Sequence, residues 1–312
     1  MTRRRVAFGL ATWVATAITL SAQSPAPRST GAVMAPDRLA RLDRVLQDYV
    51  DDGRLPGAVA LVLVDGRPVY EKAFGWADKE AGRKMTPDAL FRIASQTKAI
   101  TSTAILMLME EGRLQLTEPV SKYLPTFAKT TVAVRGANGA VEIVPAKRAI
   151  TIKDLLTHTA GISYGTNASV ASAYEAKGLG PAAGYGWYTA DKDEPVCETM
   201  DRLGTLPFVA QPGEAWVYGY NTDILGCVVE RVSGQPLDVF LTTRILAPLK
   251  MTDTFFFVPR DQAGRLTAVY ASDANGLAVR APDGAPTAGW CSQITNRSKS
   301  RLAVDMIFPG CL

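Results

Sequence analysis

The sequence predicts an α+β fold, an α/β sandwich in which an antiparallel sheet is flanked by helices and joined to a mostly helical second lobe. Two apolar, β-rich runs surround Asp65-Gly66 near the amino end, and helical spacing dominates the later half of the chain. Strands that precede a series of helices favour this class over a barrel. The 312 residues, 47% of them hydrophobic, suffice for one large domain or two closely packed lobes.

The first elements are a helix and a hairpin. Residues 38–50 place apolar side chains at helical spacing, which predicts an amphipathic helix. The run AVALVLVDGRPVYEKAFG then predicts two strands that turn at Asp65-Gly66, a strong short-range hairpin signal. A second hairpin is predicted within 131–144, where the chain turns at Asn138-Gly139.

A helix apolar all round follows Ser95. Its apolar residues are nearly continuous from Ala99 to Met109, and Gly112 supplies a C-terminal stop. Such a helix is predicted to be buried and to run through the centre of the fold.

The remaining elements are less regular. Thr151 and Asp154 fit a capping box for a short helix. Residues 162–205 show no clean period, which leaves open a long active-site loop region or a small helical lobe. From residue 221 to residue 246 helical spacing returns, with a break predicted at Ser233-Gly234.

The amino terminus has the layout of a secretory signal peptide. Arginines at 3–5 precede the uncharged apolar stretch 6–20, and small residues end at Ala22, the predicted cleavage site. A membrane anchor is the alternative, but the stretch is shorter than the roughly 20 residues of a spanning helix. We therefore expect residues 1–22 to be a signal peptide, 23–35 a leader, and the mature protein to be periplasmic or secreted without stable membrane insertion.

Composition excludes several functions. The net charge is only +4, and no basic run follows the first residues, so nucleic acid is not an expected partner. One histidine and four cysteines without CxxC spacing do not favour a zinc site, and no cofactor is called for. Cys227, inside LGCVVERV, is expected to be a buried small hydrophobe.

The motif SQTK supplies the first candidate catalytic pair, Ser95 and Lys98. Residues three apart share a helix face, so the hydroxyl and the amine can meet. A serine hydroxyl needs a base, and a lysine can serve where burial lowers its pKa. Alone, this four-residue pattern is more often a solvated cap and a surface lysine.

Tyr218, after PGEAW, is the third candidate. A phenol beside an ammonium can relay a proton between a serine and a leaving group. A core aromatic turn is the alternative interpretation.

Several blocks in order make the pattern specific. The chain resembles the penicillin-recognising serine hydrolases and class C β-lactamases, most closely the esterase-like branch called family VIII carboxylesterases. The matching text is LPGAVALVLVDGRPVYEKAFGWAD, LFRIASQTKAITSTAILMLMEEGRLQLTEPVSKYLP, VPAKRAITIKDLLTHTAGI and QPGEAWVYGYNTDILGCVVERVSGQPL. The resemblance implies a β-lactamase/transpeptidase-like fold and an acyl-enzyme on Ser95. Lys98 and Tyr218 would shuttle protons, and the Ser95 N–H would form half of the oxyanion hole.

Two residues near the motif need separate interpretation. His158 lies in LLTHTAGI, a block that the family shares without using the histidine as a base, so we expect it to hydrogen-bond a turn. Class C β-lactamases carry an asparagine two residues after the motif tyrosine, where it contacts the lactam side chain. Tyr220 occupies that place here, which favours simple esters.

The carboxy-terminal part departs from the family. No Lys-Thr-Gly-like triplet follows Tyr218, and the likeness fades over 271–287. We therefore expect residues 36–287 to form the hydrolase domain and 288–312 an atypical tail without clear strand alternation. A frameshifted or truncated end and a genuine short variant are both open. Either would leave a sheet edge unpaired and remove one oxyanion donor, which costs roughly 10²–10³ in rate.

The sequence thus predicts an exported serine hydrolase that acts on small-molecule carboxylic esters. β-Lactams and D-amino-acyl peptides are alternative substrates. A non-catalytic protein that binds penicillin or peptidoglycan, or a truncated inactive homologue, is the alternative from another class.

Overall fold

The computed structural model describes residues 34–180, 194–281 and the short strand 307–309. The helices are α1 (Pro36–Asp51), η1 (Ala94–Gln96), α2 (Thr97–Glu110), η2 (Val120–Lys122), η3 (Pro125–Lys129), α3 (Ile152–Leu156), α4 (Ala171–Glu175), α5 (Val196–Leu203), α6 (Asn221–Ser233), α7 (Leu237–Leu241), η4 (Thr242–Leu246) and η5 (Arg260–Arg265). The strands are β1 (Gly57–Val64), β2 (Arg67–Asp78), β3 (Arg83–Lys84), β4 (Leu90–Arg92), β5 (Thr131–Arg135), β6 (Val141–Pro145), β7 (Pro207–Phe208), β8 (Tyr270–Ser272), β9 (Ala278–Arg280) and β10 (Ile307–Pro309). The predicted α+β class is confirmed.

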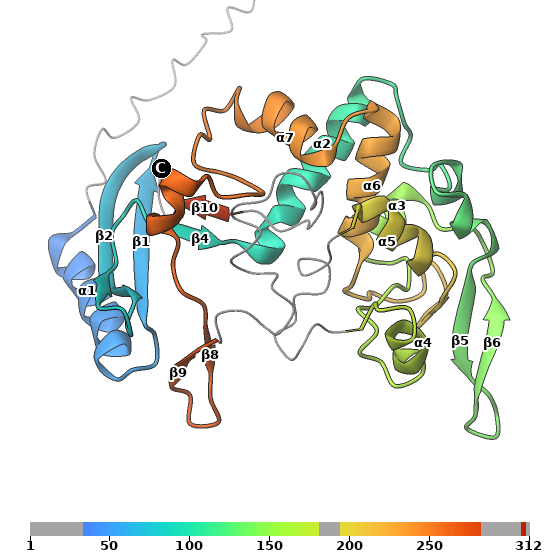
Figure 1. Ribbon diagram of the computed structural model, residues 1–312, viewed down its shortest axis with the longest axis horizontal. Helices are drawn as coiled ribbons and strands as arrows, with labels where there is room; N and C mark the ends of the chain where they lie inside the picture. The colour runs from blue at the N-terminus through green and yellow to red at the C-terminus, as the bar shows by residue number, and fades with distance from the viewer. Residues whose placement is uncertain (1–33, 181–193, 282–306, 310–312) are drawn as a thin grey trace, which may run out of the picture.

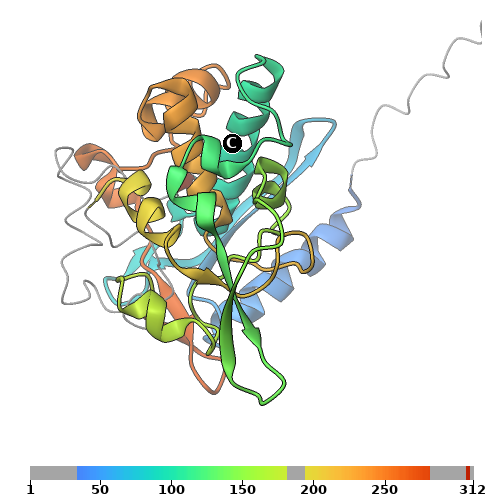
Figure 2. The same ribbon diagram turned by 90° about the vertical axis from the view of Figure 1, so that its right-hand side faces the viewer.

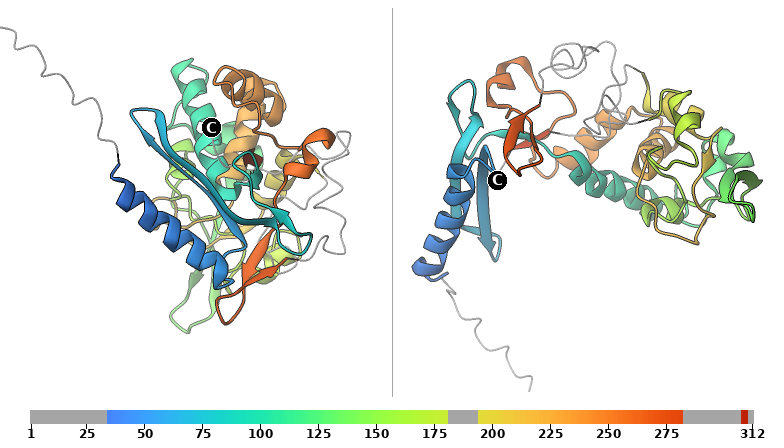
Figure 3. Two further views of the ribbon diagram at one scale, coloured as in Figure 1. Left: turned by 90° about the vertical axis from the view of Figure 1, so that its left-hand side faces the viewer. Right: turned by 90° about the horizontal axis from the view of Figure 1, so that it is seen from below.

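One lobe is built on the antiparallel sheet β1-β2-β3, with α1 lying along it (Figures 1 and 3). The predicted turn between β1 and β2 is present. Asp65 and Gly66 both adopt positive φ, 50° and 74°, the geometry that a two-residue type I′ turn requires. This geometry explains why Asp-Gly marks the hairpin in the sequence.

The other lobe is mostly helical, and α2 crosses between the two lobes (Figure 1). Helix α6 packs against α2, α3 and α5, and the hairpin β5-β6 projects from the far end (Figures 1 and 2). The largest hydrophobic core draws its side chains from this lobe and from α2. The helical lobe is therefore the platform on which α2 is held.

Several local predictions for this lobe are confirmed. Thr151 and Asp154 form both bonds of a capping box at α3. The predicted hairpin is present as β5-β6, which pair from Thr131 opposite Pro145 to Arg135 opposite Val141, and Gly139 in the connecting turn has φ 79°. Gly234 ends α6 in the left-handed conformation (φ 73°), where the break was predicted.

The expectation that α2 is buried all round is only half right. Thr101, Ala104, Ile105 and Leu108 are buried, but Leu106 on the opposite side is 41% exposed. The sequence from Ala99 to Met109 is apolar on all sides of the helix, but in the structure other elements cover one side more fully than the other.

Strand β1 is less covered than its sequence suggests. None of its eight residues, GAVALVLV, is buried, and Leu63 is 50% exposed. Within the described part of the chain β1 pairs only with β2, so its outer edge carries no strand. An open apolar edge of this kind invites association with other strands.

The carboxy-terminal tail corrects one prediction. Strand β10 lies within 288–312, where no strand was expected, and pairs antiparallel with β4 from Ile307 opposite Arg92 to Pro309 opposite Leu90. Three residues are too few for alternation to reveal a strand, and this pairing depends on a partner far away in sequence. The segment 282–306 and the predicted signal peptide and most of the leader, within 1–33, lie outside the described residues.

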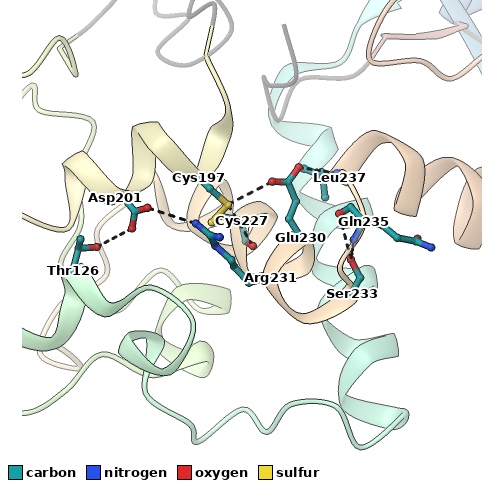
Figure 4. Close-up of a disulfide and its surroundings, with 9 residues drawn as sticks. All are labelled: Thr126, Cys197, Asp201, Cys227, Glu230, Arg231, Ser233, Gln235 and Leu237. Atoms are coloured by element: carbon teal, nitrogen blue, oxygen red, sulfur yellow. Dashed lines mark hydrogen bonds and ion pairs between the residues drawn. A yellow bond between two sulfur atoms is a disulfide. The ribbon is translucent and has the colours of Figure 1, made fainter. Parts of the chain in front are cut away.

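A disulfide replaces the expected free thiol at Cys227. Cys197 of α5 and Cys227 of α6 are bonded, with their Cα atoms 5.0 Å apart (Figure 4). Cys227 is buried, as expected, but its burial results from the packing of α5 on α6, which the spacing of the cysteines does not encode. The Asp201–Arg231 ion pair joins the same two helices beside the bond (Figure 4).

This bond predicts a stability effect. It closes a loop with a sequence separation of 30 residues. Because it restricts the unfolded chain, the double variant Cys197→Ala/Cys227→Ala should lose about 3–4 kcal/mol of unfolding free energy relative to the oxidised wild type. Urea unfolding with and without reductant measures this. Wild type in reductant should resemble the variant, and equal stability of both proteins without reductant would contradict the pairing.

Candidate active site

The turn between β4 and α2 presents Ser95. Ser95 lies in η1, one turn of 3₁₀ helix immediately before α2, and the residue is exposed. Ala94 before it has φ 43°, a conformation that is strained for a residue with a side chain. Such strain is found at functional sites, where the surrounding structure holds it. The hydroxyl therefore stands at the amino end of a helix, where backbone N–H groups favour negative charge.

Lys98 lies one turn along, in the first turn of α2. Its Nζ is 3.3 Å from Ser95 Oγ and 3.3 Å from the hydroxyl oxygen of Tyr164. It also lies 5.0 Å from the centroid of the Tyr218 ring. The ammonium thus contacts the serine and two aromatic side chains together.

Tyr218 reaches the same point from a distant part of the chain. Its hydroxyl donates to Ser95 Oγ at 2.5 Å across a sequence separation of 123 residues. Gly219 allows this approach, since a Cβ there would lie 2.3 Å from the Ile162 carbonyl oxygen. The three candidates chosen from the sequence, Ser95, Lys98 and Tyr218, therefore lie within direct contact.

Tyr164 was not selected from the sequence. It lies in the segment 162–205, whose lack of periodicity gave no reason to favour one residue. Its ring meets the Tyr218 ring edge-on at 5.7 Å between centroids, and its hydroxyl contacts Lys98. The position of an aromatic residue two places beyond the block THTAGI is the signal that could have identified it.

Aromatic rings border one side of the site. Trp216 is 68% exposed and stacks on Tyr218, with ring centroids 5.8 Å apart. An exposed tryptophan beside an exposed serine offers apolar surface to a bound molecule.

His158 lies beneath Tyr218, with ring centroids 4.9 Å apart. Its Nδ1 is 3.0 Å from Asn221 Nδ2, a contact that fits the predicted structural role. Burial, and then the charge of Lys98, lower the pKa of this histidine below its usual value. The imidazole is therefore uncharged at neutral pH.

Tyr220 and Asn221 both face the interior. Tyr220 is fully buried, and its hydroxyl donates to the Leu179 carbonyl at 2.7 Å. Asn221 is fully buried as well, and its Nδ2 lies near His158 and the carbonyls of Ile162 and Val217. Neither side chain is placed to contact a molecule bound at Ser95.

The described residues, 34–180, 194–281 and 307–309, hold neither a metal-binding cluster nor a membrane-spanning helix. They contain no group of three His, Cys, Asp or Glu side chains that could hold a metal ion. They also contain no helix with the length and apolarity of a membrane span.

Comparisons with known proteins agree on one family. The family model described as beta-lactamase matches residues 42–297. Esterase EstB of Burkholderia gladioli is 39% identical over 217 residues, which cover 70% of this chain and 51% of that protein. Lovastatin esterase of Penicillium rubens is 32% identical over 242 residues, covering 76% and 58%. The chain spans about half the length of these curated relatives.

Solved structures give the same result. EstCE1, a hydrolase with promiscuous acyltransferase activity, superposes with a TM-score of 0.68 at 26% identity, covering 87% of this chain and 69% of that one. Simvastatin synthase LovD from Aspergillus terreus has a TM-score of 0.68 at 25% identity, covering 88% and 66%.

The contact between Tyr164 and Lys98 predicts an effect on Ser95. Tyr164→Phe removes the hydroxyl that contacts the Lys98 ammonium. We expect the rate of Ser95 phosphonylation by a fluorophosphonate to fall about three- to tenfold, because one hydrogen bond contributes about 0.5–1.5 kcal/mol. Intact-mass kinetics measure this rate. Tyr123→Phe, a tyrosine distant in sequence and bonded to Glu118, is the control and should leave the rate unchanged. Equal rates for the Tyr164 variant and wild type would contradict the role.

Proposed function

The chain belongs to the beta-lactamase family, and on that premise we propose that it hydrolyses carboxylic esters through an acyl-enzyme on Ser95. The observation that carries the proposal is the contact geometry of Ser95, whose Oγ lies 2.5 Å from the Tyr218 hydroxyl and 3.3 Å from Lys98 Nζ. A hydroxyl in contact with a phenol and an amine can lose its proton at the moment of attack.

In acylation, Ser95 Oγ attacks the ester carbonyl carbon, and its proton passes to the Tyr218–Lys98 pair. Tyr218 is the nearer of the two. The carbonyl oxygen takes up negative charge, which N–H groups at the start of α2 stabilise. When the bond between the carbonyl carbon and the alcohol oxygen breaks, the pair returns the proton to the alcohol, which leaves. The acyl group remains on Ser95.

In deacylation, water attacks the acyl carbon and gives a proton to the same pair. The bond to Ser95 Oγ breaks, Ser95 regains a proton, and the carboxylic acid is released. Each proton is returned within the cycle, so Lys98 and Tyr218 act as a shuttle and no cofactor takes part.

The surroundings of the motif favour esters over β-lactams. Tyr220 occupies the place of the asparagine that contacts the lactam side chain in class C β-lactamases, and it is buried and bonded to Leu179. Asn221 next to it is buried too. The exposed Trp216 offers apolar contact to an acyl or alcohol group without requiring an amide. The esterase activities named for EstB and the lovastatin esterase support the same class.

The test is covalent labelling followed by turnover. Residues 23–312 incubated with a fluorophosphonate should gain a single adduct that Ser95→Ala lacks. p-Nitrophenyl butyrate should then be hydrolysed, and Ser95→Ala and Lys98→Ala should each reduce turnover by at least about 10³-fold, as expected of residues that act as a unit. Nitrocefin and a D-alanyl peptide rank the other substrates.

Each outcome has a definite reading. Turnover of nitrocefin above the ester would replace the esterase proposal with a β-lactamase. An adduct without release would indicate a binding protein. If the folded protein forms no adduct, the proposal that the chain is an enzyme is overturned.

We also propose that the protein is exported to the periplasm or beyond. The basic and apolar layout of residues 1–22 supports export. The Cys197–Cys227 disulfide supports it independently, because such bonds persist in oxidising compartments and are rare in the cytosol.

Export predicts a defined amino terminus. Expression of the full chain in a Gram-negative host should yield protein that begins at Gln23 in the periplasm or medium, as measured by intact mass. Deletion of residues 6–20 should retain the protein in the cytosol. Uncleaved full-length protein in the cytosol would contradict the proposal.

A further inference from the structure

The loop that carries Tyr218 is held by His158 and Asn221. The Val217 N–H donates to the His158 carbonyl at 2.7 Å. On its other side, the Val217 carbonyl accepts from Asn221 Nδ2 at 3.2 Å. The peptide groups that flank Val217 are therefore both bonded, and Tyr218 is the next residue. Its position over Ser95 depends on these bonds.

Asn221 is in turn oriented by the imidazole. Its Nδ2 is 3.0 Å from His158 Nδ1 and 3.4 Å from the Ile162 carbonyl oxygen. An amide N–H can donate to Nδ1 only when Nδ1 carries no proton. The observed arrangement is therefore that of a neutral His158 with its proton on Nε2.

The amide also has a second possible orientation. Asn221 Oδ1 is buried and has no hydrogen-bond partner among the described residues. A protonated His158 would present an N–H at Nδ1, where it would meet the Nδ2 hydrogens. Rotation of the amide would bring Oδ1 to that N–H and take Nδ2 away from Val217 and Ile162. Asn221 thus has two orientations that the charge of His158 selects between.

We propose that His158 is a positioning residue that holds Tyr218 over Ser95 only while its imidazole is uncharged, so that acid switches the site off through Asn221. The inference rests on the proposed function for the role of Tyr218 and adds a regulatory step to it. His158 transfers no proton to substrate in this scheme.

The electrostatic surroundings support the same direction. Lys98 on α2 is the charged group that acts on the imidazole, and with burial it lowers the pKa of His158. The neighbouring elements also carry the Arg148–Asp154 ion pair and Lys153 at α3, and Asp223 in the first turn of α6. The loop that leads to Tyr218 carries Glu214, which is paired with Lys147. The pKa of His158 is lower in the folded than in the unfolded state. The contribution of His158 to the free energy of unfolding is therefore complete above about pH 6.5, and it is lost as the pH falls from there through the folded-state pKa.

The backbone indicates which substitution to use. His158 has φ 56°, a left-handed conformation that asparagine tolerates well. Asparagine also places a carbonyl oxygen close to the position of Nδ1. His158→Asn therefore keeps the acceptor for Asn221 and removes the titration, whereas His158→Ala removes both.

The wild type can be tested without any variant. His158 is the single histidine of the chain, so a protein without a histidine tag gives one imidazole spin system in ¹H–¹⁵N spectra. We expect the Nε2–H tautomer at pH 8 and a titration midpoint below 6.5, the ordinary histidine value. The Nδ1–H tautomer, or a midpoint at or above 6.5, would overturn the proposal.

Ester turnover against pH tests the consequence. Below the midpoint, kcat/KM of the wild type should fall more steeply than that of His158→Asn, by a further factor of about ten per pH unit. The reason is that the variant lacks the inactivating protonation of His158. At pH 8, His158→Asn should match the wild type, and His158→Ala should be at least about threefold slower. An identical acid limb in wild type and His158→Asn would overturn the switch.

The two proposals fail separately. If the wild type hydrolyses no ester, the esterase proposal falls, and the switch is decided by the NMR titration together with urea unfolding. Between about pH 6.5, the ordinary histidine value, and the titration midpoint, His158→Asn should lose less stability than the wild type. Parallel losses would overturn the switch.

Discussion

The packing of α6 against α2 is the constraint on which the site depends. Helix α2 carries Lys98 in its first turn and follows directly on the turn η1 that holds Ser95, and α6 begins three residues after Tyr218. Buried side chains along both helices, such as Ile105 and Val228, fix their relative position. Interiors pack at crystal-like density, so a small shift between these helices would be resisted by many contacts. A hydrogen bond of 2.5 Å between Tyr218 and Ser95 is possible only because this interface sets the distance.

The exposed side chain of Tyr218 is held over Ser95 by buried polar groups below its loop. Gly219 brings the loop against the Ile162 carbonyl, and the His158–Asn221 pair ties the same loop from below. Buried polar networks are worth most when fully satisfied, and they are sensitive to a change of charge. Lys98 couples the two layers, since its ammonium contacts Ser95 and also acts on His158. The lysine of the proposed proton shuttle therefore also influences the histidine that holds the Tyr218 loop.

Stabilisation is uneven across the molecule. The helical lobe holds the large core, and the Cys197–Cys227 bond joins two of its helices. The sheet lobe has a small cluster around Ala77 and Met85, and β1 remains partly exposed with an open edge. Ser95 lies in the turn η1 that connects β4 to α2. Its presentation therefore depends on the stable lobe through α2 and on the weaker one through β4.

The sequence by itself determined what is local. Asp65-Gly66, the Thr151 capping box and Gly234 each specify backbone geometry within a few residues, so the hairpins, caps and breaks could be predicted together with the α+β class. The order of the family blocks placed Ser95, Lys98 and Tyr218 among the candidates. Only the tertiary structure decided what depends on distant partners. These are the disulfide at Cys227, the contact of Tyr164 with Lys98, the pairing of β10, the exposed side of α2 and the direction of the Asn221 amide. Periodicity and spacing report neighbours along the chain, whereas these features arise from segments that meet only after the helices have packed.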